Sequence, residues 1–173
     1  AQSDSTTKKL SNKELKKNHF LLEGAGNTLF YMLGFERNFN LSDASRFSLT
    51  LGGTYIPANK QHVAFNYYTI GGTYHIRRDF LLSKAHSKKK VKRNDKVGFF
   101  ETGIFYINQQ PDLRESRPWI NWYLGYNLYP SESSWFFRFG TVINILRPEV
   151  EREIKELPFS PIPLPRFVLG YSF

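Results

Sequence analysis

Apolar and polar residues alternate along most of this chain, and the alternation is easiest to follow at its C-terminal end. Large apolar side chains would stand in a row on one side of an extended chain: Phe167, Leu169, Tyr171 and Phe173. The side chains between them are smaller or polar: Val168, Gly170 and Ser172. A repeat of two residues predicts a β-strand whose two faces meet different surroundings.

The same alternation recurs and predicts eight strands, separated by segments rich in Gly, Pro, Asn and Ser. The predicted strands cover residues 19–25, 29–39, 46–56, 63–77, 97–107, 119–129, 135–146 and 165–173. In the fourth of them, Val63, Phe65 and Tyr67 are out of step with the residues that follow, which predicts a bulge or a strand that rises beyond a bilayer. The segments 78–96 and 108–118 are predicted to be a long basic turn and a polar loop.

The two faces of these strands differ in a way that distinguishes a membrane barrel from a soluble one. One face carries Leu, Ile, Phe, Tyr and Trp, and the other is mostly Gly, Ser, Thr and Asn. A lipocalin-type barrel or a sandwich would place many Lys, Glu, Asp and Gln on its outer face, whereas small residues suit the crowded lumen of an eight-stranded barrel. We therefore predict an all-β fold: an eight-stranded antiparallel transmembrane up-and-down β-barrel.

Length and composition agree with this fold. The chain has 173 residues, and no stretch approaches the ~18 uninterrupted apolar residues that a membrane helix needs. Residues 1–18 are polar and rich in lysine, and we expect a flexible periplasmic leader there, followed by the barrel at 19–173. The chain begins Ala-Gln-Ser-Asp without an initiator Met, as expected after removal of a signal peptide; trimming at another point is the alternative. An even number of strands places both termini on the periplasmic side of the outer membrane.

The formal net charge is +9, and much of the excess lies in one stretch of the long turn. The candidate contact residues are Lys88, Lys89, Lys90, Lys92 and Arg93. In a soluble protein such a run would suggest nucleic acid. In a periplasmic turn, anionic lipid headgroups or an acidic protein partner fit better, and we expect no nucleic acid. A solvated turn without a partner is the alternative.

Four charged residues fall on the small, lumen-facing side of their strands: Glu23, Glu36, Glu101 and Arg138. Charges in a lumen must be paired or hydrated. We expect them to form one hydrogen-bonded cluster that plugs the barrel, since eight strands leave room only for side chains. A binding site or an ion path is the functional alternative. Bulky residues in the same inward phase should also block conduction: Phe30, Met32, Phe99, Phe105, Tyr123 and Phe136.

Nothing in the sequence indicates catalysis. The chain has no cysteine, and its four histidines lack metal-ligand spacing: His19, His62, His75 and His86. A lipid A deacylase of this architecture would need a His–Ser–acid arrangement, and none is visible. We therefore expect neither enzymatic activity nor a cofactor.

Several motifs resemble small outer-membrane proteins of Bacteroidota. They are Phe20-Leu-Leu-Glu-Gly-Ala-Gly-Asn27, Leu33-Gly-Phe-Glu-Arg37, Phe100-Glu-Thr-Gly103, Trp135-Phe-Phe-Arg-Phe-Gly140 and Leu164-Pro-Arg-Phe-Val-Leu-Gly-Tyr-Ser-Phe173. The resemblance covers most of 19–173, apart from the long basic turn. That family is largely uncharacterised, so the resemblance implies an outer-membrane location and no reaction.

The leading functional hypothesis is a scaffold or accessory subunit of an outer-membrane protein assembly. The connections expected on the outer side are short apart from 147–164, which suits adhesion poorly, and a filled lumen suits transport poorly. The expected partners are outer-membrane lipids, lipopolysaccharide and a protein such as a larger barrel. A lipid A-modifying enzyme and a stand-alone structural barrel are the alternatives.

Overall fold

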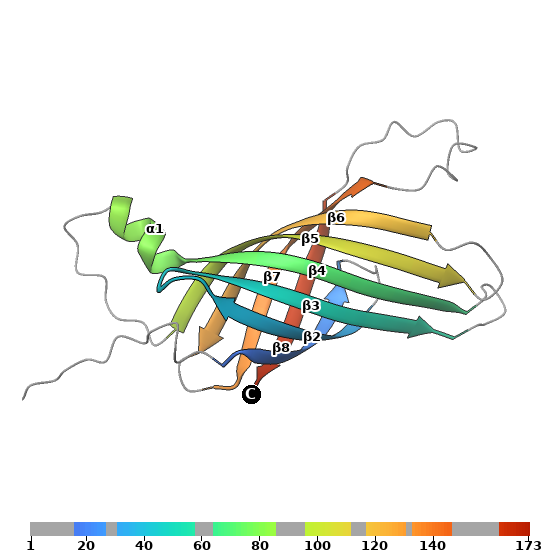
Figure 1. The fold of residues 1–173 in the computed structure, drawn as a ribbon, viewed down its shortest axis with the longest axis horizontal. Helices are drawn as coiled ribbons and strands as arrows, with labels where there is room; N and C mark the ends of the chain where they lie inside the picture. Colours follow the sequence, from blue (N-terminus) through green and yellow to red (C-terminus); the bar gives the residue numbers. More distant parts are fainter. Residues whose placement is uncertain are drawn as a thin grey trace, which may run out of the picture.

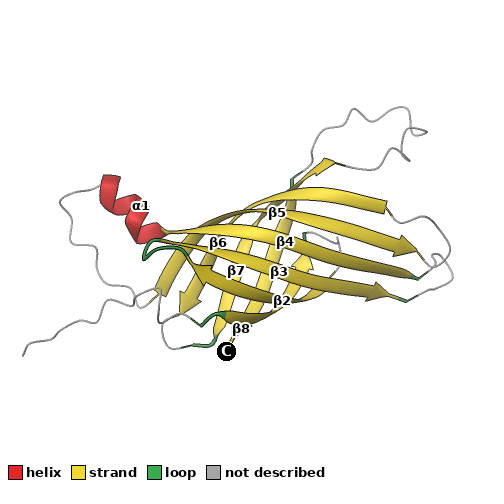
Figure 2. Cartoon of the chain, in the orientation of Figure 1, coloured by secondary structure: helices red, strands yellow, loops and turns green. Residues whose placement is uncertain are grey.

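Eight strands close into one antiparallel barrel, in which each strand pairs with its neighbours in sequence and β8 pairs with β1 (Figure 1). The computed structural model describes residues 16–26, 31–57, 64–85, 96–111, 117–130, 133–146 and 163–173. The strands are β1 (Asn18–Ala25), β2 (Tyr31–Asn40), β3 (Ser45–Ile56), β4 (Phe65–Arg77), β5 (Lys96–Pro111), β6 (Arg117–Pro130), β7 (Trp135–Leu146) and β8 (Leu164–Ser172). One helix, α1 (Arg78–Ala85), follows β4 (Figure 2). The predicted eight-stranded antiparallel barrel is confirmed. No helix in the described part of the chain is long and apolar enough to cross a membrane.

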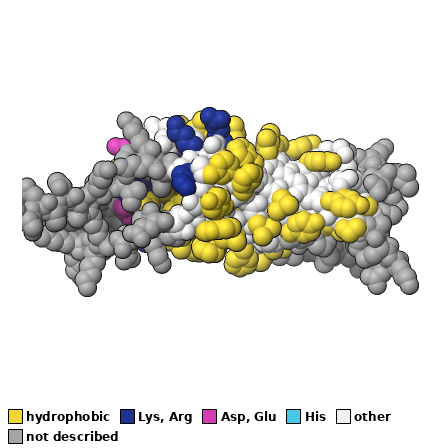
Figure 3. Space-filling model, turned by 90° about the horizontal axis from the view of Figure 1, so that it is seen from below, with side chains coloured by type: hydrophobic (Ala, Val, Ile, Leu, Met, Phe, Trp, Pro, Cys, Tyr) yellow, Lys and Arg dark blue, Asp and Glu magenta, His cyan; other side chains and the backbone are white. Residues whose placement is uncertain are grey.

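The two-residue repeat sorts side chains between the lumen and the outer surface. In β3, for example, Ser48 and Thr50 are buried inside, whereas Leu49 and Leu51 point outward and are half exposed. Exposed apolar side chains from the other strands continue this surface as a belt around the barrel (Figure 3). An apolar outside around a polar inside is the reverse of a soluble barrel and is the arrangement of a membrane β-barrel.

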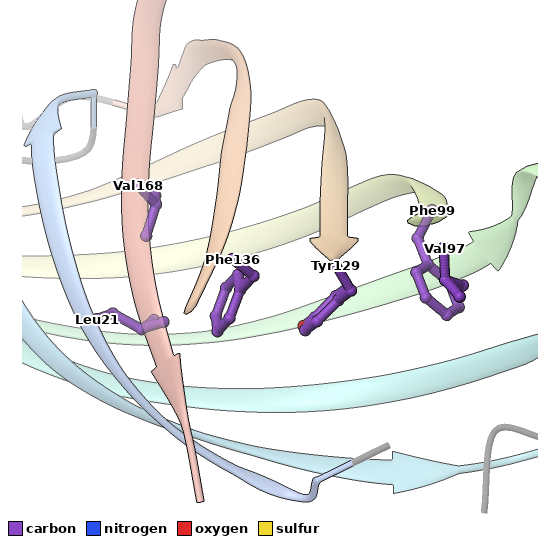
Figure 4. Close-up of a cluster of buried hydrophobic side chains, with 6 residues drawn as sticks. All are labelled: Leu21, Val97, Phe99, Tyr129, Phe136 and Val168. Carbon is purple, nitrogen blue, oxygen red and sulfur yellow. The ribbon is translucent and has the colours of Figure 1, made fainter. Parts of the chain in front are cut away.

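The lumen is filled by side chains. One cluster lies within the barrel as a layer of apolar residues (Figure 4): Leu21, Val97, Phe99, Tyr129, Phe136 and Val168. Phe105, Tyr123 and Val142 form a second cluster. Large rings fit because glycines face them. A Cβ added at Gly170 would lie 2.0 Å from the Phe136 ring, and one at Gly71 would lie 2.2 Å from the Phe105 ring. The barrel is therefore a packed core rather than an open tube.

Both termini of the barrel lie at one end, which we call the terminal end. The Phe173 amide donates to the Asn18 carbonyl at 3.0 Å, and the Lys16 ammonium donates to the Ser172 carbonyl at 3.1 Å. Helix α1 leaves the barrel at the same end, at the left of Figure 1. The opposite end is called the far end.

The wall of the barrel is uneven in height. Strands β1 and β8 have 8 and 9 residues, whereas β4, β5 and β6 have 13, 16 and 14. Strands β3 to β6 therefore run on past the others toward the far end (Figure 1). We call β7, β8, β1 and β2 the short wall, and β3 to β6 the long wall.

Three predicted segments differ in detail from the structure. For Val63, Phe65 and Tyr67 the predicted alternatives are a bulge or a strand that rises beyond a bilayer. The bulge is absent, because Tyr67 is buried in phase with Thr69 and the pairing of β4 runs unbroken from 65 to 77, whereas β4 does continue past the short wall (Figure 1). At the far end the Tyr67 ring contacts Trp119 at 5.9 Å, so this large residue fills the lumen there. The described register shift lies instead between Ile120 and Asn121, where β6 pairs with β7. Val63 lies outside the described residues.

The other two differences concern connections. The polar loop expected at 108–118 is shorter, because β5 continues to Pro111 and β6 begins at Arg117. Polar residues such as Gln109 and Gln110 remain in the ladder because backbone pairing does not depend on an apolar face. The long turn predicted at 78–96 has the expected bounds, because β4 ends at Arg77 and β5 begins at Lys96, but its first part is the helix α1. Its run Lys88 to Arg93 lies outside the described residues.

Candidate functional site

Arg138 of β7 is the centre of the main polar cluster in the lumen. Its guanidinium donates to both carboxylate oxygens of Glu36, at 2.6 Å from Nη1 to Oε2 and 2.5 Å from Nη2 to Oε1. Its Nε lies 3.6 Å from Oε1 of Glu101. All three side chains are buried, so the cluster is a two-carboxylate ion pair held away from solvent.

Neighbouring strands supply further donors to the two carboxylates. The Thr50 hydroxyl donates to Glu36 at 3.2 Å, and the Tyr123 hydroxyl donates to Glu101 at 3.1 Å. His75 Nδ1 lies 2.7 Å from Glu101 Oε1. Thr50 is the ladder partner of Glu36, and His75 is that of Glu101, so strand register brings these side chains together.

Glu23 belongs to a second ion pair, and this corrects the expectation of one cluster of four. Its Oε2 accepts from Arg166 Nε at 2.8 Å and lies 2.7 Å from Arg166 Nη2. The ladder partner of Glu36 is His19, and Glu23 lies four residues farther along β1, which is about 13 Å of strand. Glu23 is therefore displaced along the barrel from the Arg138 cluster.

Arg166 was missing from the sequence prediction, although a signal for it existed. It shares the inward phase of Val168 and Gly170, so the alternation of the last strand already placed it in the lumen. Its guanidinium lies 4.2 Å from the Tyr123 ring centre and 4.7 Å from that of Phe105. Tyr123 thus contacts Arg166 through its ring and Glu101 through its hydroxyl, and it links the two ion pairs.

The third buried arginine, Arg46, has a different environment. Its guanidinium lies 4.1 Å from the ring centre of Phe99 and 4.4 Å from that of Tyr129. None of its three nitrogens hydrogen-bonds to any described residue. With Arg138 and Arg166 it makes three buried arginines in the described lumen, the same number as the buried glutamates there.

Two hydrogen-bonded histidines complete the polar lumen. His75 Nε2 lies 2.8 Å from the Ser48 hydroxyl, so Ser48, His75 and Glu101 stand in the order of a serine hydrolase triad. Sequence reasoning missed this arrangement because only the register reveals it. His19 lies 2.8 Å from the Ser172 hydroxyl through Nδ1 and contacts Asn38 through Nε2. Ser48, His75 and His19 are all fully buried.

Burial decides what this chemistry can do. A nucleophilic serine must reach a substrate, and a triad requires room for that substrate beside it. The Ser48 side chain is enclosed in the lumen together with its histidine and glutamate. The arrangement therefore serves as a hydrogen-bonded plug that ties β3, β4, β5 and β6 together. Among the described residues no group of three His, Asp or Glu side chains is placed to hold a metal ion.

No protein-family model matches this chain, and no curated protein sequence matches it. Two solved structures share its general arrangement. The N-terminal β-barrel domain of OprF from Pseudomonas aeruginosa is 12% identical, with 91% of this chain and 96% of that chain covered and a TM-score of 0.47. Ail, the attachment invasion locus protein of Yersinia pestis, is 11% identical, with 92% and 100% covered and a TM-score of 0.40. The barrel assignment rests on the strand pairing of this chain and is independent of both likenesses.

Proposed function

We propose that this chain is a non-enzymatic outer-membrane β-barrel that acts as a scaffold or accessory subunit of an outer-membrane protein assembly. Its filled lumen argues against transport, since ion pairs and rings occupy the interior. Burial of the Ser48, His75 and Glu101 side chains argues against hydrolysis. Among the described parts of the barrel, the outer wall is then the surface through which it would contact another molecule.

The observation that carries the proposal is the composition of the short wall. Most of the exposed phenylalanines of the described strands lie there: Phe20, Phe35, Phe39, Phe137, Phe139, Phe167 and Phe173. The long wall presents mainly Leu, Ile and Tyr at its exposed positions, with Phe100 as its exposed phenylalanine. Phenylalanine is among the residues enriched at the cores of protein interfaces, so its concentration on one wall favours a protein contact there, although exposed tyrosines and Trp122 also lie on the long wall.

The short wall also has a hollow that could receive a side chain from a partner. It has a volume of about 600 Å³ and lies over β7, β8 and β1. Phe139, Phe167 and Gly24 are successive ladder partners along one of its edges. A Cβ at Gly24 would meet nothing within 4 Å, so the wall is open there.

Strand length gives a physical reason for a partner at this wall. A membrane-spanning strand needs about 9–11 residues. In this wall β1, with 8 residues, falls just below that length, and β8 and β2, with 9 and 10, only just meet it. A wall that is short for its bilayer is accommodated by local thinning or by association with another protein. Packing against a larger barrel would cover the short wall and relieve this mismatch.

Location and orientation are part of the proposal. An apolar belt on a closed eight-stranded barrel fits the outer membrane of a Gram-negative cell, with both chain termini on the periplasmic side. The motifs at 20–27, 33–37 and 164–173 support a Bacteroidota lineage. Residues 86–95 then follow α1 on the periplasmic side, where Lys88, Lys89, Lys90, Lys92 and Arg93 would meet anionic lipid or an acidic partner.

Site-specific photo-crosslinking in native membranes tests the proposal. A photoreactive amino acid at Phe167 should give an adduct with a larger outer-membrane barrel, and the adduct should weaken when Gly24→Leu fills the hollow. The matched control is the same probe at Ile70, which is similarly exposed on the long wall. Protein adducts from neither wall would mean that the barrel stands alone.

A second experiment tests the filled lumen. The purified barrel should give no single-channel steps in planar bilayers, because Phe99, Phe105 and Phe136 are fully buried inside it. Reproducible steps would contradict the plugged lumen and favour transport.

A lipid-modifying enzyme is the second candidate, and the Ser48–His75–Glu101 arrangement is the observation that favours it. A fluorophosphonate probe reacts with activated serines and tests for one directly. We expect no labelling of the folded barrel in membranes. Labelling that is lost in Ser48→Ala would establish a reactive serine and overturn the non-enzymatic proposal.

A further inference from the structure

Helix α1 stands at the membrane edge of the barrel. It begins at Arg78. Two residues earlier, Ile76 lies on the same outward-facing side of β4 as Tyr74. The turn between β2 and β3 is hydrogen-bonded to the end of β4, because the Arg77 amide donates to the Ala44 carbonyl at 2.8 Å. The helix leaves the rim of the barrel at its terminal end (Figure 1). Its residues therefore lie at the boundary between the apolar belt and the aqueous phase.

The start of the helix presents apolar side chains rather than burying them. Phe80 is 48% exposed and Leu81 is 41% exposed, comparable with lipid-facing residues such as Phe100 at 45%. An eight-residue helix is too short to be stable alone in water, so it needs an environment that stabilises it. A membrane interface provides one, because apolar side chains enter the acyl boundary while the backbone stays hydrogen-bonded.

The charges beside α1 fit the same environment. Arg77 and Arg78 flank its start, and both lie near Asp79, at 3.5 and 3.8 Å. Two exposed basic residues lie at the same end of the barrel: Lys17 just before β1, and Arg37 on β2. We call Lys17, Arg37, Arg77 and Arg78 the basic rim. Lys and Arg side chains gather beside one end of the apolar belt, at the left of Figure 3.

We propose that α1 is an interfacial helix that binds the phospholipid leaflet at the terminal end of the barrel. Phe80 and Leu81 enter the acyl boundary, and Arg78, whose side chain is 30% exposed, faces the phosphate groups of anionic headgroups. Positive charge next to an apolar surface is the combination that an anionic membrane attracts, and the lipid contact continues the belt already formed by the strands. The inference rests on the membrane location in the proposed function and is independent of any partner protein.

Site-directed spin labelling tests the position of α1. The chain has no cysteine, so Leu81→Cys provides a single labelling site in the full protein. In vesicles of phosphatidylcholine and phosphatidylglycerol, the label should be more accessible to oxygen, which concentrates in lipid, than to a nickel chelate in water. Asp43→Cys, in the exposed turn at the same end, is the matched control and should remain accessible to nickel.

A label in the belt separates failure of this inference from failure of the membrane barrel. Ile70→Cys should report lipid in every case where the barrel inserts. Nickel access at Leu81 equal to that at Asp43, with Ile70 in lipid, would overturn the interfacial helix alone. Nickel access at all three positions would overturn the membrane barrel itself.

The spin label at position 81 also tests the role of the arginine charge and the kind of lipid that α1 binds. Each basic residue near an anionic surface contributes about 1 kcal/mol, so removing one arginine should lower the ratio of embedded to aqueous Leu81 label about fivefold. Arg78→Gln provides the variant, and phosphatidylcholine vesicles should lower the ratio in the same direction. An unchanged ratio would remove the role of the arginine. If the Leu81 label becomes embedded only when lipid A or native membrane proteins are present, then phospholipid is not the binding partner of α1.

Discussion

Arg138 and Arg46 lie in the same lumen and are equally buried, yet their surroundings are opposite. Arg138 makes two hydrogen bonds to Glu36 and pairs with Glu101. Arg46 lies between the rings of Phe99 and Tyr129 and makes no hydrogen bond to a described residue. Burial of a guanidinium therefore does not by itself show that it stabilises the barrel.

The physical difference lies in what removal of each arginine would leave behind. Loss of Arg138 would leave two buried carboxylates without their common cation, and an uncompensated buried charge is costly. Loss of Arg46 would break ring contacts and no hydrogen bond. Arg166 stands between them, with one carboxylate and two rings. Substitutions at these positions should therefore rank in that order.

The largest effect is expected for Arg138→Met. The free energy of unfolding should fall by about 3–5 kcal/mol, because Glu36 and Glu101 both lose a buried partner. Urea titration of the barrel folded in phospholipid vesicles measures this change. Asp43→Asn, at an exposed turn position, should remain within about 0.5 kcal/mol of the wild type. A loss below about 1 kcal/mol for Arg138→Met would contradict its central role.

Arg166→Met should cost about 3 kcal/mol, at the lower end of the same range, because only one carboxylate, Glu23, loses its arginine. The double variant Glu23→Leu, Arg166→Met should recover most of this loss, since replacing both members of a buried ion pair by apolar residues is often close to neutral. The same titrations provide the comparison. A double variant no more stable than Arg166→Met would show that the pair contributes through contacts other than its charge.

Thr50→Val should cost about 1.5 kcal/mol, because one hydrogen bond to the Glu36 carboxylate is lost while Arg138 still neutralises it. Thr73→Val is the matched control on β4. Its hydroxyl is buried but has no partner among the described residues, so its loss should leave stability unchanged. Equal effects of the two substitutions would show that side-chain shape rather than the hydrogen bond matters.

The smallest effect is expected for Arg46→Met. Loss of cation–π contacts should be offset by removal of a buried charge that lacks hydrogen bonds, so the change should stay within about 1 kcal/mol. The result can be measured beside Arg138→Met under identical conditions. A loss as large as that of Arg138→Met would reveal further partners of Arg46 and would remove the contrast between the two sites.

The two-residue alternation, read from the sequence, was sufficient for the barrel. It placed Leu49 and Leu51 outside and Ser48 and Thr50 inside, and the structure confirms this assignment. A strand repeats every two residues whatever its neighbours are, so local order in the chain sets which face each side chain takes. The apolar pattern was misleading at Tyr67, which is out of step with the outward apolar residues of β4 because its ring fills the lumen.

Only the tertiary structure decided which charges meet. Glu36 and Arg138 are 102 residues apart, and Glu23 and Arg166 are 143 apart. Alternation puts all four in the lumen, but strand register and barrel closure set how far along the axis each one lies. The same register aligns Ser48, His75 and Glu101 from three adjacent strands. Helix α1 was missed because eight residues are too few to show a helical repeat of apolar positions. The role proposed for its exposed apolar residues depends on their place beside the edge of the belt, which the sequence does not show.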